Sequence, residues 1–516
     1  MREDATMIHT SLWQVRPTSR HPDGSRDPLT APARLIGDAA VNGSRIKSGM
    51  TKKVGSVLLL LTTAACAVGP NYERPQAKAA AVGPFVGSAP ATSPGEPLPA
   101  DWWRLYEDPV LDALIARALA ANTDLRVAAA NLGRARAALG EAKAARLPST
   151  ETSGGVNYGD ATSGGFAPGD EQWTYSAGLA VSWEVDLFGR VRRAIEAARA
   201  DAEAEAAARD RVRVTVVANL VRAYGDACAL ADSIGVARES LATAEASLKL
   251  VRAQEKAGSA GRLDVERAAT LAATARAAVP PLESQRRAAL LELAALIGAM
   301  PSEIPPEAAA CGRIPAVRAP IPIGDGATLL RRRPDVREAE RRLAADTARI
   351  GIATADLFPR ITLGGSANFL RNDQIRGDDS LTFSVGPLLN WSFPNIAAAR
   401  ARLRQARFQG DAALASFDGV VLTALKEVEQ ALAAYAAEQQ RNAALDEARR
   451  RADAAYRLAD ARYRAGSISY LDLLDAQRTL LGARGALASS NQRLADARVD
   501  LFKALGGGWE ERAAAG

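Results

Sequence analysis

Strict alternation of apolar and polar positions is strongest over residues 173–187. Every second residue there is apolar or aromatic, and the residues between are mostly small or polar. This period of two predicts a β-strand with one apolar face. Its length suits a membrane-crossing strand, which needs about 9–11 residues in the bilayer, and aromatic residues lie near both ends of the apolar face, as at membrane interfaces. Taken alone, the pattern favours a half-buried strand of a soluble sheet. The apolar side comprises Trp173, Tyr175, Ala177, Leu179, Val181, Trp183, Val185 and Leu187.

Three further strands are expected, over residues 150–158, 361–370 and 381–393. The last of them alternates most clearly, with Phe383 and Trp391 among the residues on its apolar side. We therefore predict that Trp173, Tyr175, Trp183, Phe383 and Trp391 are membrane-facing strand aromatics.

Long helices occupy most of the remaining chain. Alanine and arginine, both strong helix formers, are abundant. Helices are expected over residues 110–146, from 190 to 256, from 262 to 297, from 395 to 464 and up to about 505. Apolar residues recur every seven positions in the second of these, which is coiled-coil spacing: Leu220, Ala227, Ile234, Leu241 and Leu248.

The chain repeats itself once. Trp183 and Trp391, like Gly258 and Gly466, are 208 positions apart. Each copy is predicted to run helix, strand, strand, long helix, helix. The first repeat covers residues 109–299 and the second 328–506, with a proline-rich linker at 300–327 and a short tail at 507–516.

The N-terminal region is predicted to contain a secretory signal peptide and a lipid-attachment site. Residues 1–49 are polar and aperiodic, which predicts disorder or an extension upstream of the true start at Met50. Residues 50–65 have the basic, apolar and small-residue regions of a secretory signal. The small residues before Cys66 resemble a bacterial lipobox, although Thr63 stands where leucine is usual, so we expect Cys66 to carry a diacylglycerol thioether and an N-acyl chain. Residues 66–108 form the lipidated tether.

Composition argues against several function classes. The net charge of +6 is modest, and acidic and basic residues are mixed along the helices, so nucleic-acid binding is not expected. Both histidines, His9 and His21, precede the signal sequence. We therefore expect no enzyme activity, no metal site and no cofactor other than the covalent lipid.

Four membrane strands in one chain cannot close a barrel, because open edges are not tolerated in lipid. Two copies would give eight strands, with a lumen filled by side chains, and three copies would give twelve, with a usable pore. The predicted fold is therefore mainly α-helical, with strands that form a barrel from several chains and long helices that continue it as a tube.

Several motifs together resemble the TolC-like outer-membrane efflux protein family, in its lipoprotein branch that serves resistance–nodulation–division pumps. The resemblance covers about residues 50–506. Its most specific motifs are R-R-P-D-V at 332–336 and L-L-D-A-Q-R at 473–478, joined by F-P-R-I at 358–361 and C-A-V-G-P-N-Y-E-R-P at 66–75.

The resemblance implies a homotrimer with a twelve-stranded transmembrane β-barrel in the bacterial outer membrane and a long periplasmic α-helical barrel. It implies passive conduction of drugs or other small molecules from an inner-membrane resistance–nodulation–division pump and a periplasmic adaptor protein. It also implies that the turns between the long helices and the helices that follow them dock the adaptor and form the periplasmic entrance. The tip residues are Gly258, Ser259, Ala260, Gly261, Gly466, Ser467 and Ile468.

Charged and aromatic residues beside the second tip are candidates for a periplasmic gate. Tyr463 and Arg464 precede the turn, and aspartates follow it, so Arg–Asp and Tyr–Asp links across the hairpin are expected to hold the entrance shut, each weakly. A solvated polar helix end is the alternative for each residue. The candidates are Tyr463, Arg464, Tyr470, Asp472, Asp475 and, at the first tip, Asp264.

Two rival functions use parts of the same pattern. An outer-membrane component of type I protein secretion would have the same fold with a different cargo. A soluble coiled-coil scaffold would keep the helices but leaves the signal sequence and the alternating strands unexplained. Cys228 is expected to be a packing residue, and its pairing with Cys311 is left open because sequence shows no proximity.

Overall fold

The computed structural model describes residues 13–14, 67–87, 89, 92–160, 171–317 and 319–507. They divide into two compact units. Of the described residues, the sheet unit comprises those up to Gln76, Leu139–Ala198 and Ala344–Asp411, and the helical body comprises Ala77–Ala138, Arg199–Leu343 and those from Ala412 on. Cys66, the signal sequence and nearly all of the N-terminal extension lie outside the described residues.

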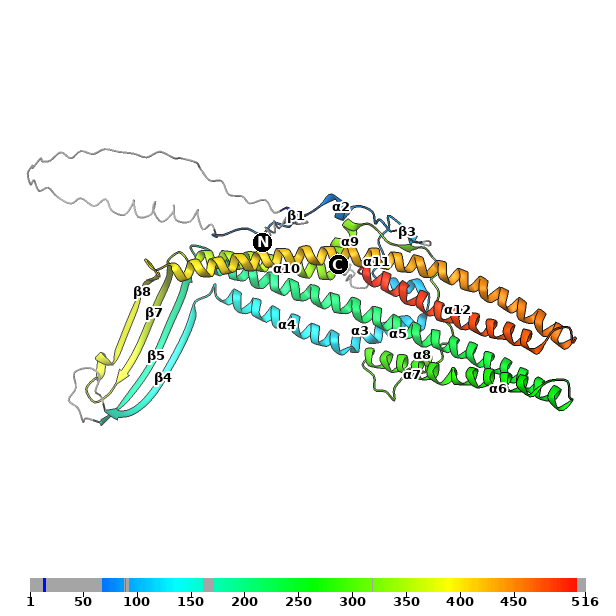
Figure 1. The fold of residues 1–516 in the computed structure, drawn as a ribbon. Coiled ribbons are helices and arrows are strands. Elements are labelled where there is room, and N and C mark those ends of the chain that lie inside the picture. Colours follow the sequence, from blue (N-terminus) through cyan, green and yellow to red (C-terminus); the bar gives the residue numbers. More distant parts are fainter. Residues whose placement is uncertain are drawn as a thin grey trace, which may run out of the picture. The chain divides into compact units, whose positions relative to one another are not determined.

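The described chain is mainly helical, as predicted (Figure 1). Its α-helices are α2 (Ala79–Val82), α3 (Pro109–Ala121), α4 (Thr123–Ala144), α5 (Arg190–Lys256), α6 (Arg262–Ala277), α7 (Val279–Leu296), α8 (Pro306–Ala309), α9 (Gly326–Arg332), α10 (Pro334–Ala355), α11 (Ala397–Arg464) and α12 (Tyr470–Ala504). Its strands are β1 (Trp13–Gln14), β2 (Gln76–Ala77), β3 (Thr92–Ser93), β4 (Ser149–Asp160), β5 (Glu171–Val185), β6 (Ile321–Pro322), β7 (Arg360–Arg371) and β8 (Leu381–Asn390). The short 3-10 helices η1 (Trp102–Tyr106) and η2 (Gly377–Ser380) complete the element order.

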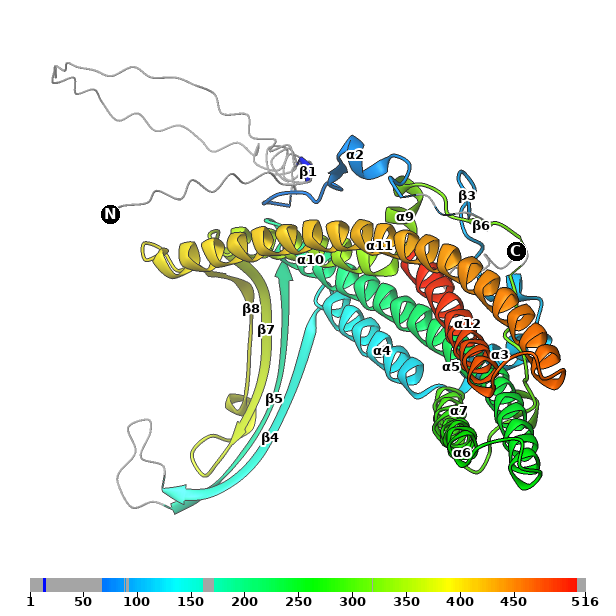
Figure 2. The same ribbon diagram turned by 45° about the vertical axis from the view of Figure 1, so that its right-hand side comes forward.

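The sheet unit contains a four-stranded sheet in the order β4-β5-β7-β8, antiparallel throughout. The strands lie side by side and curve together (Figure 2). Val181 lies opposite Thr150 on one side and Gly365 on the other, and Gly365 lies opposite Val385. Because side chains alternate along every strand, this register places the apolar rows of β5, β7 and β8 on one face, together with Val156 and Tyr158 of β4.

The fourth strand ends earlier than the alternation predicted. β8 stops at Asn390, so Trp391 and Phe393 follow the strand instead of belonging to it. Their rings stack on each other, with centroids 4.5 Å apart. Apolar alternation continues past the last ladder hydrogen bonds, which is why the sequence pattern overestimated the strand.

Two predicted helices are broken. Asn122 interrupts the first, between α3 and α4, because its side-chain oxygen accepts hydrogen bonds from the backbone N–H of Asp124 and Leu125 and so starts a new helix. The returning helix breaks at Ala278, between α6 and α7. Pro280 and Pro281 follow at once, and proline lacks the N–H that a continuous helix would need.

The core of the helical body lies between α3, α5, α7, α11 and α12. Its largest buried side chains include Trp102, Phe502, Leu220, Leu293 and Leu432. The ring centroids of Trp102 and Phe502 lie 4.5 Å apart, so the end of the tether packs against α12. Among the described residues, α5 alone has an 18-residue window apolar enough to span a membrane, but 67% of this window is buried, as in a core helix.

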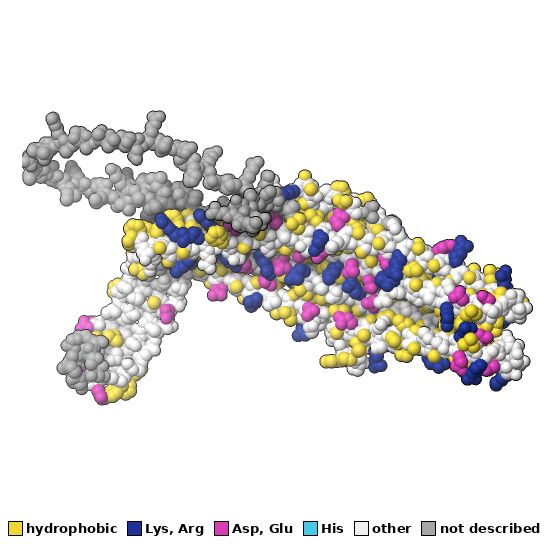
Figure 3. Space-filling model, in the orientation of Figure 1, with side chains coloured by type: hydrophobic (Ala, Val, Ile, Leu, Met, Phe, Trp, Pro, Cys, Tyr) yellow, Lys and Arg dark blue, Asp and Glu magenta, His cyan; other side chains and the backbone are white. Residues whose placement is uncertain are grey.

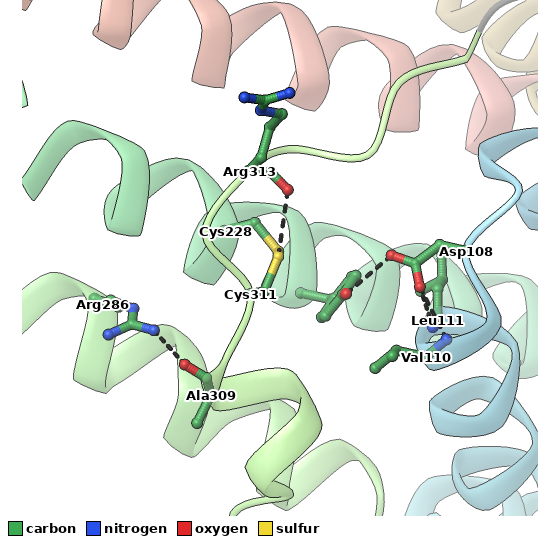
Figure 4. The surroundings of a disulfide bond; sticks show 9 residues. Asp108, Val110, Leu111, Cys228, Arg286, Ala309, Cys311 and Arg313 are labelled. Carbon is green, nitrogen blue, oxygen red and sulfur yellow. Dashed lines mark hydrogen bonds between the residues drawn. A yellow bond between two sulfur atoms is a disulfide. The ribbon is translucent and has the colours of Figure 1, made fainter. Parts of the chain in front are cut away.

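The linker between the predicted repeats is more ordered than its prolines suggested. It contains α8 and also β6, which pairs in parallel with β3 of the tether. Cys311 in this linker forms a disulfide with Cys228 of α5, with Cα atoms 5.1 Å apart (Figure 4). Cys228 is fully buried in the core, as expected of a packing residue, and the pairing with Cys311 that the sequence left open is a disulfide.

Candidate functional site

The strand-to-helix joint after β5 is built from the sequence D-L-F-G-R. The carboxylate of Asp186 accepts hydrogen bonds from the backbone N–H of Val191 and Arg192, at 2.9 and 2.8 Å, and so caps the N-terminus of α5. Gly189 adopts a φ of 77°, which favours glycine. Glu184 forms an ion pair with Arg190 across the turn, with 2.9 Å between Arg190 Nε and Glu184 Oε1. Both acidic residues thus shape the joint, a role that alternation alone did not reveal.

Two tryptophans fix the ends of the sheet against the preceding helices. Trp183 Nε1 donates to the carbonyl of Arg146, at 2.9 Å, and Trp391 Nε1 donates to the carbonyl of Leu357, at 3.1 Å. Each carbonyl belongs to the segment between a helix and the next strand. The two indoles therefore play matching parts, with an apolar ring and a bonded polar edge, which suits a membrane interface.

The apolar face of the sheet is open along its length. Trp173 and Tyr175 are about half exposed, and Phe383 and Val385 are 82% and 86% exposed. Apolar area of this extent on one continuous face has a large free-energy cost in water. The two outer strands, β4 and β8, each pair on one side only within the described part of the chain. The face and both edges therefore need partners.

The opposite face is small and polar. Ser366 and Ser384 share a hydrogen bond of 2.9 Å, and Asn368 donates to Ser366 at 3.2 Å. A Cβ on Gly178 would lie 2.7 Å from Ser153 Oγ, so glycine makes room for the polar row. Such a face suits contact with water.

The two predicted tips are helix reversals with the same geometry. In the first, Gly258 has φ 76° and Ser259 N donates to Gln254 O at 2.9 Å. In the second, Gly466 has φ 73° and Ser467 N donates to Arg462 O at 3.0 Å. Both are Schellman turns, in which glycine takes the left-handed position. The turns predicted at 258–261 and 466–468 are confirmed.

Beyond the turns, the returning helices differ. α12 begins with a capping box, in which Ser469 and Asp472 bond each other's backbone N–H. These bonds from Ser469 hold the pKa of the Asp472 carboxyl below its usual value. α6 begins after Gly261 without a side-chain cap.

Tyrosines join the second hairpin to α5. The Tyr463 hydroxyl donates to Gln254 Oε1, and the hydroxyls of Tyr470 and Ser247 lie 3.3 Å apart. The two tyrosine rings are 5.7 Å apart. Burial raises the pKa of both tyrosines, so both stay neutral hydrogen-bonding groups at physiological pH. Gln254 and Ser247 were missed by sequence reasoning, because only the fold brings α5 beside this hairpin.

The ion pairs expected across the second hairpin are replaced by others. Arg464 pairs with Asp460 at 2.9 Å, four residues earlier on its own helix, and Asp472 is engaged by Ser469. Neighbours at i and i+4 share one helix face, so Arg464 needs no partner across the turn. Within one chain, Arg464 and Asp472 thus bond other groups, and Arg–Asp and Tyr–Asp links repeated around a ring of chains stay a prediction.

The two remaining gate candidates, Asp264 and Asp475, lie in different surroundings. Asp264 contacts Arg267 of its own helix at 3.5 Å, and Asp475 is exposed on α12. Whether any of these carboxylates faces a lumen stays a prediction, because that depends on neighbouring chains.

The R-R-P-D-V motif holds the end of α12. Arg333 is buried, and its Nη1 donates to the carbonyl of Ala504 at 2.9 Å. Its Nη2 contacts Asp335 and Glu427, each at 2.7 Å. One guanidinium thus bonds the C-terminus of α12 and ties it to α10 and α11. The motif is an architectural clamp of the helical body.

Charges are interspersed along the helices. On the face shown in Figure 3, basic and acidic side chains alternate over the helices, and the sheet carries few charges. No group of three or more His, Cys, Asp or Glu residues within the described ranges could hold a metal ion.

Similarity to known proteins extends over nearly the whole described chain. The model of the outer membrane efflux protein family matches residues 114–299 and 327–507. The chain is 34% identical over 478 residues to the toluene efflux pump outer membrane protein TtgC of Pseudomonas putida, and the match covers 90% of this chain and 97% of the relative. The structure of the outer-membrane channel OprN matches with a TM-score of 0.78 and 37% identity, over 86% of this chain and 100% of that one. The open state of the MtrE outer membrane channel of Neisseria gonorrhoeae matches with a TM-score of 0.74 and 28% identity, over 86% of this chain and 99% of that one.

Proposed function

The chain belongs to the outer membrane efflux protein family, and we propose that it is the outer-membrane channel through which a tripartite efflux pump releases small molecules. The proposal rests on one observation above all. The four-stranded sheet exposes an apolar face, and within the described residues β4 and β8 each pair on one side only; a closed barrel in lipid would cover the face and pair both edges.

Three copies are the assembly we propose. Three sheets of four strands would close a twelve-stranded barrel, with the polar faces around Ser366 and Gly178 toward the lumen. Two copies would leave too little room for a pore. The element order strand–strand–long helix–helix after each of α4 and α10 supports a chain built from two repeats, at 109–299 and 328–506.

The partners follow from the same assignment. An inner-membrane pump of the resistance–nodulation–division class would supply the cargo through a periplasmic adaptor, which would dock at the tips around Gly258 and Gly466. Both turns are exposed, and glycine at each leaves room for a close backbone approach. Cys66, acylated after removal of residues 50–65, would anchor each chain in outer-membrane lipid.

The proposal is tested by reconstitution and by efflux. Purified protein should form stable open pores in planar bilayers. Expressed with its pump and adaptor in an efflux-deficient Gram-negative host, it should lower the accumulation of a fluorescent pump substrate. An empty vector and a host lacking only the pump are the controls. Absence of both conductance and efflux, with protein present in the outer membrane, would overturn the assignment.

A further inference from the structure

The helical body contains a partly open cavity of about 410 Å³ between α5, the α6–α7 pair and α12. Its walls include Leu230 and Ala237 of α5, Leu271 and Leu282 of the returning pair, and Leu481 and Gly485 of α12. All of these residues belong to the helical body. This volume falls in the range of about 300–1,000 Å³ that is usual for sites of small molecules.

The cavity has two causes in the sequence. First, the returning chain is interrupted beside the cavity, because α6 ends at Ala277, α7 begins at Val279, and Pro280 and Pro281 lie in its first turn. Second, α12 presents small residues at this level, and a Cβ built on Gly485 would meet no atom within 4 Å. Neither a larger side chain nor a straight helix fills the space.

The lining of the cavity carries no formal charge. The described residues around it are aliphatic or small, together with the hydroxyl or amide side chains of Ser233, Ser240, Thr274, Gln285, Ser489 and Gln492. By contrast, the surrounding helices are rich in ion pairs, such as Arg238–Glu283 at 2.6 Å. Moving a charged ligand into an uncharged, partly dry space is costly, whereas hydroxyl and amide groups can satisfy a neutral polar group.

We propose that this cavity binds an uncharged amphipathic small molecule, with an aromatic or aliphatic body and one or two hydrogen-bonding groups. The apolar wall would bury the body of the ligand, and the hydroxyl and amide groups would orient its polar end. The inference goes beyond the proposed function, because it requires only the folded helical body and would hold whatever the channel conducts.

A pair of cysteine variants on α12 allows a direct test. Gly485 lines the cavity and Gly482 does not. Both are exposed, and a Cβ at either position meets nothing within 4 Å, so Gly485→Cys and Gly482→Cys should fold equally well. Cys228 and Cys311 are joined in a disulfide and will not compete for a thiol reagent. The protein without either substitution serves as the control for any labelling at Cys66.

The measurement is the rate of N-ethylmaleimide labelling, followed by intact mass, in full-length protein held in amphipol. The probes are N-phenyl-1-naphthylamine, which is uncharged, and 8-anilinonaphthalene-1-sulfonate, which adds one negative charge to the same ring system. At ten times its Kd the uncharged probe should slow labelling at position 485 about tenfold, because only about a tenth of the sites stay empty. Position 482 should change little, and the anionic probe should protect neither.

Each other outcome contradicts the inference. If the uncharged probe protects neither thiol, the cavity does not bind this class, or neighbouring chains fill it. Equal protection of both thiols would mean general shielding without a site. Equal protection of position 485 by both probes would show that the cavity does not select against charge.

Discussion

In the sheet, Phe383 and Val385 are 82% and 86% exposed, whereas in the helical body Leu220 and Phe502 are fully buried. The body buries a large apolar core within one chain, mainly between α3, α5, α7, α11 and α12. The sheet forms backbone hydrogen bonds only between its own four strands. Its apolar side chains stay exposed, and within the described residues its two outer strands each pair on one side only. One chain therefore contains a unit with a buried core of its own and a unit whose apolar face and outer strands we propose are covered by lipid and by other copies. Variants that damage one unit and spare the other test this difference.

The largest effect is expected from the disulfide of the helical body. Cys228 and Cys311 are 83 residues apart, and a cross-link that closes a loop of this length contributes about 4.5 kcal/mol in the chain-entropy account. Cys228→Ala/Cys311→Ala should lower the midpoint of thermal unfolding followed by circular dichroism at 222 nm. Membrane insertion should survive at low temperature. An unchanged midpoint would mean that β3–β6 pairing and core packing already hold the linker.

Loss of the Arg333 clamp should come next. Arg333→Ala leaves Glu427 and Asp335 without their buried partner and frees the end of α12, which should cost about 3 kcal/mol. Arg331→Ala is the matched control, since Arg331 is exposed directly before the motif and should change stability by less than about 0.5 kcal/mol. Chemical unfolding of the helices gives both values. Equal effects in the two variants would refute the clamp.

A charge on the sheet separates lipid from water. Val181→Arg and Ala180→Arg alter neighbouring residues of β5 that are both exposed within one chain but lie on opposite faces. If the Val181 face meets lipid, Val181→Arg should cost about 2 kcal/mol or more and reduce folded protein in the outer-membrane fraction. Ala180→Arg should insert with nearly normal yield. Equal yields would remove the distinction between the two faces.

The smallest effect is a pH dependence in the helical body. Burial and the neighbouring carboxylate of Asp226 raise the pKa of Asp496 to about 6, while Arg222 opposes the shift. Because this pKa is raised above its unfolded value, Asp496 stabilises the fold most below about pH 4, and this stability is lost as pH rises through 6. Asp496→Asn should therefore raise the thermal midpoint at pH 7.5 and flatten its change between pH 7.5 and 5. A variant with the same pH profile as the unmodified protein would assign the dependence elsewhere, for example to Asp226, whose pKa burial also raises.

Local patterns predicted the elements well. Alternation located the strands, and α5 ends at Lys256 as expected. Both the strand period of two and the helical period depend only on residues close in the sequence, so they can be recognised without the fold. The breaks at Asn122 and Ala278 were missed for different reasons. Asn122 ends one helix by capping the next, which its identity alone does not reveal. The pair Pro280–Pro281, by contrast, marks a helix break in the sequence itself.

Contacts between distant segments could not be predicted. The distance between Cys228 and Cys311 cannot be read from the sequence. Several aspartates near the turn were possible ion-pair partners for Arg464, and the structure pairs it with Asp460 on its own helix face. The tip turns were predictable because glycine marks the left-handed residue of each. The bonds of Tyr463 and Tyr470 to α5 depend on which helices pack together, and that is decided by the whole core.

The number of chains in the assembly tests the central claim most directly. Native mass spectrometry of the detergent-solubilised, full-length protein counts them without reference to activity. Closure of a barrel from four-stranded sheets predicts a species of three chains that persists when detergent is removed in the gas phase. A stable monomer or dimer as the largest specific species would contradict the account, because neither could give both a closed barrel and an open pore.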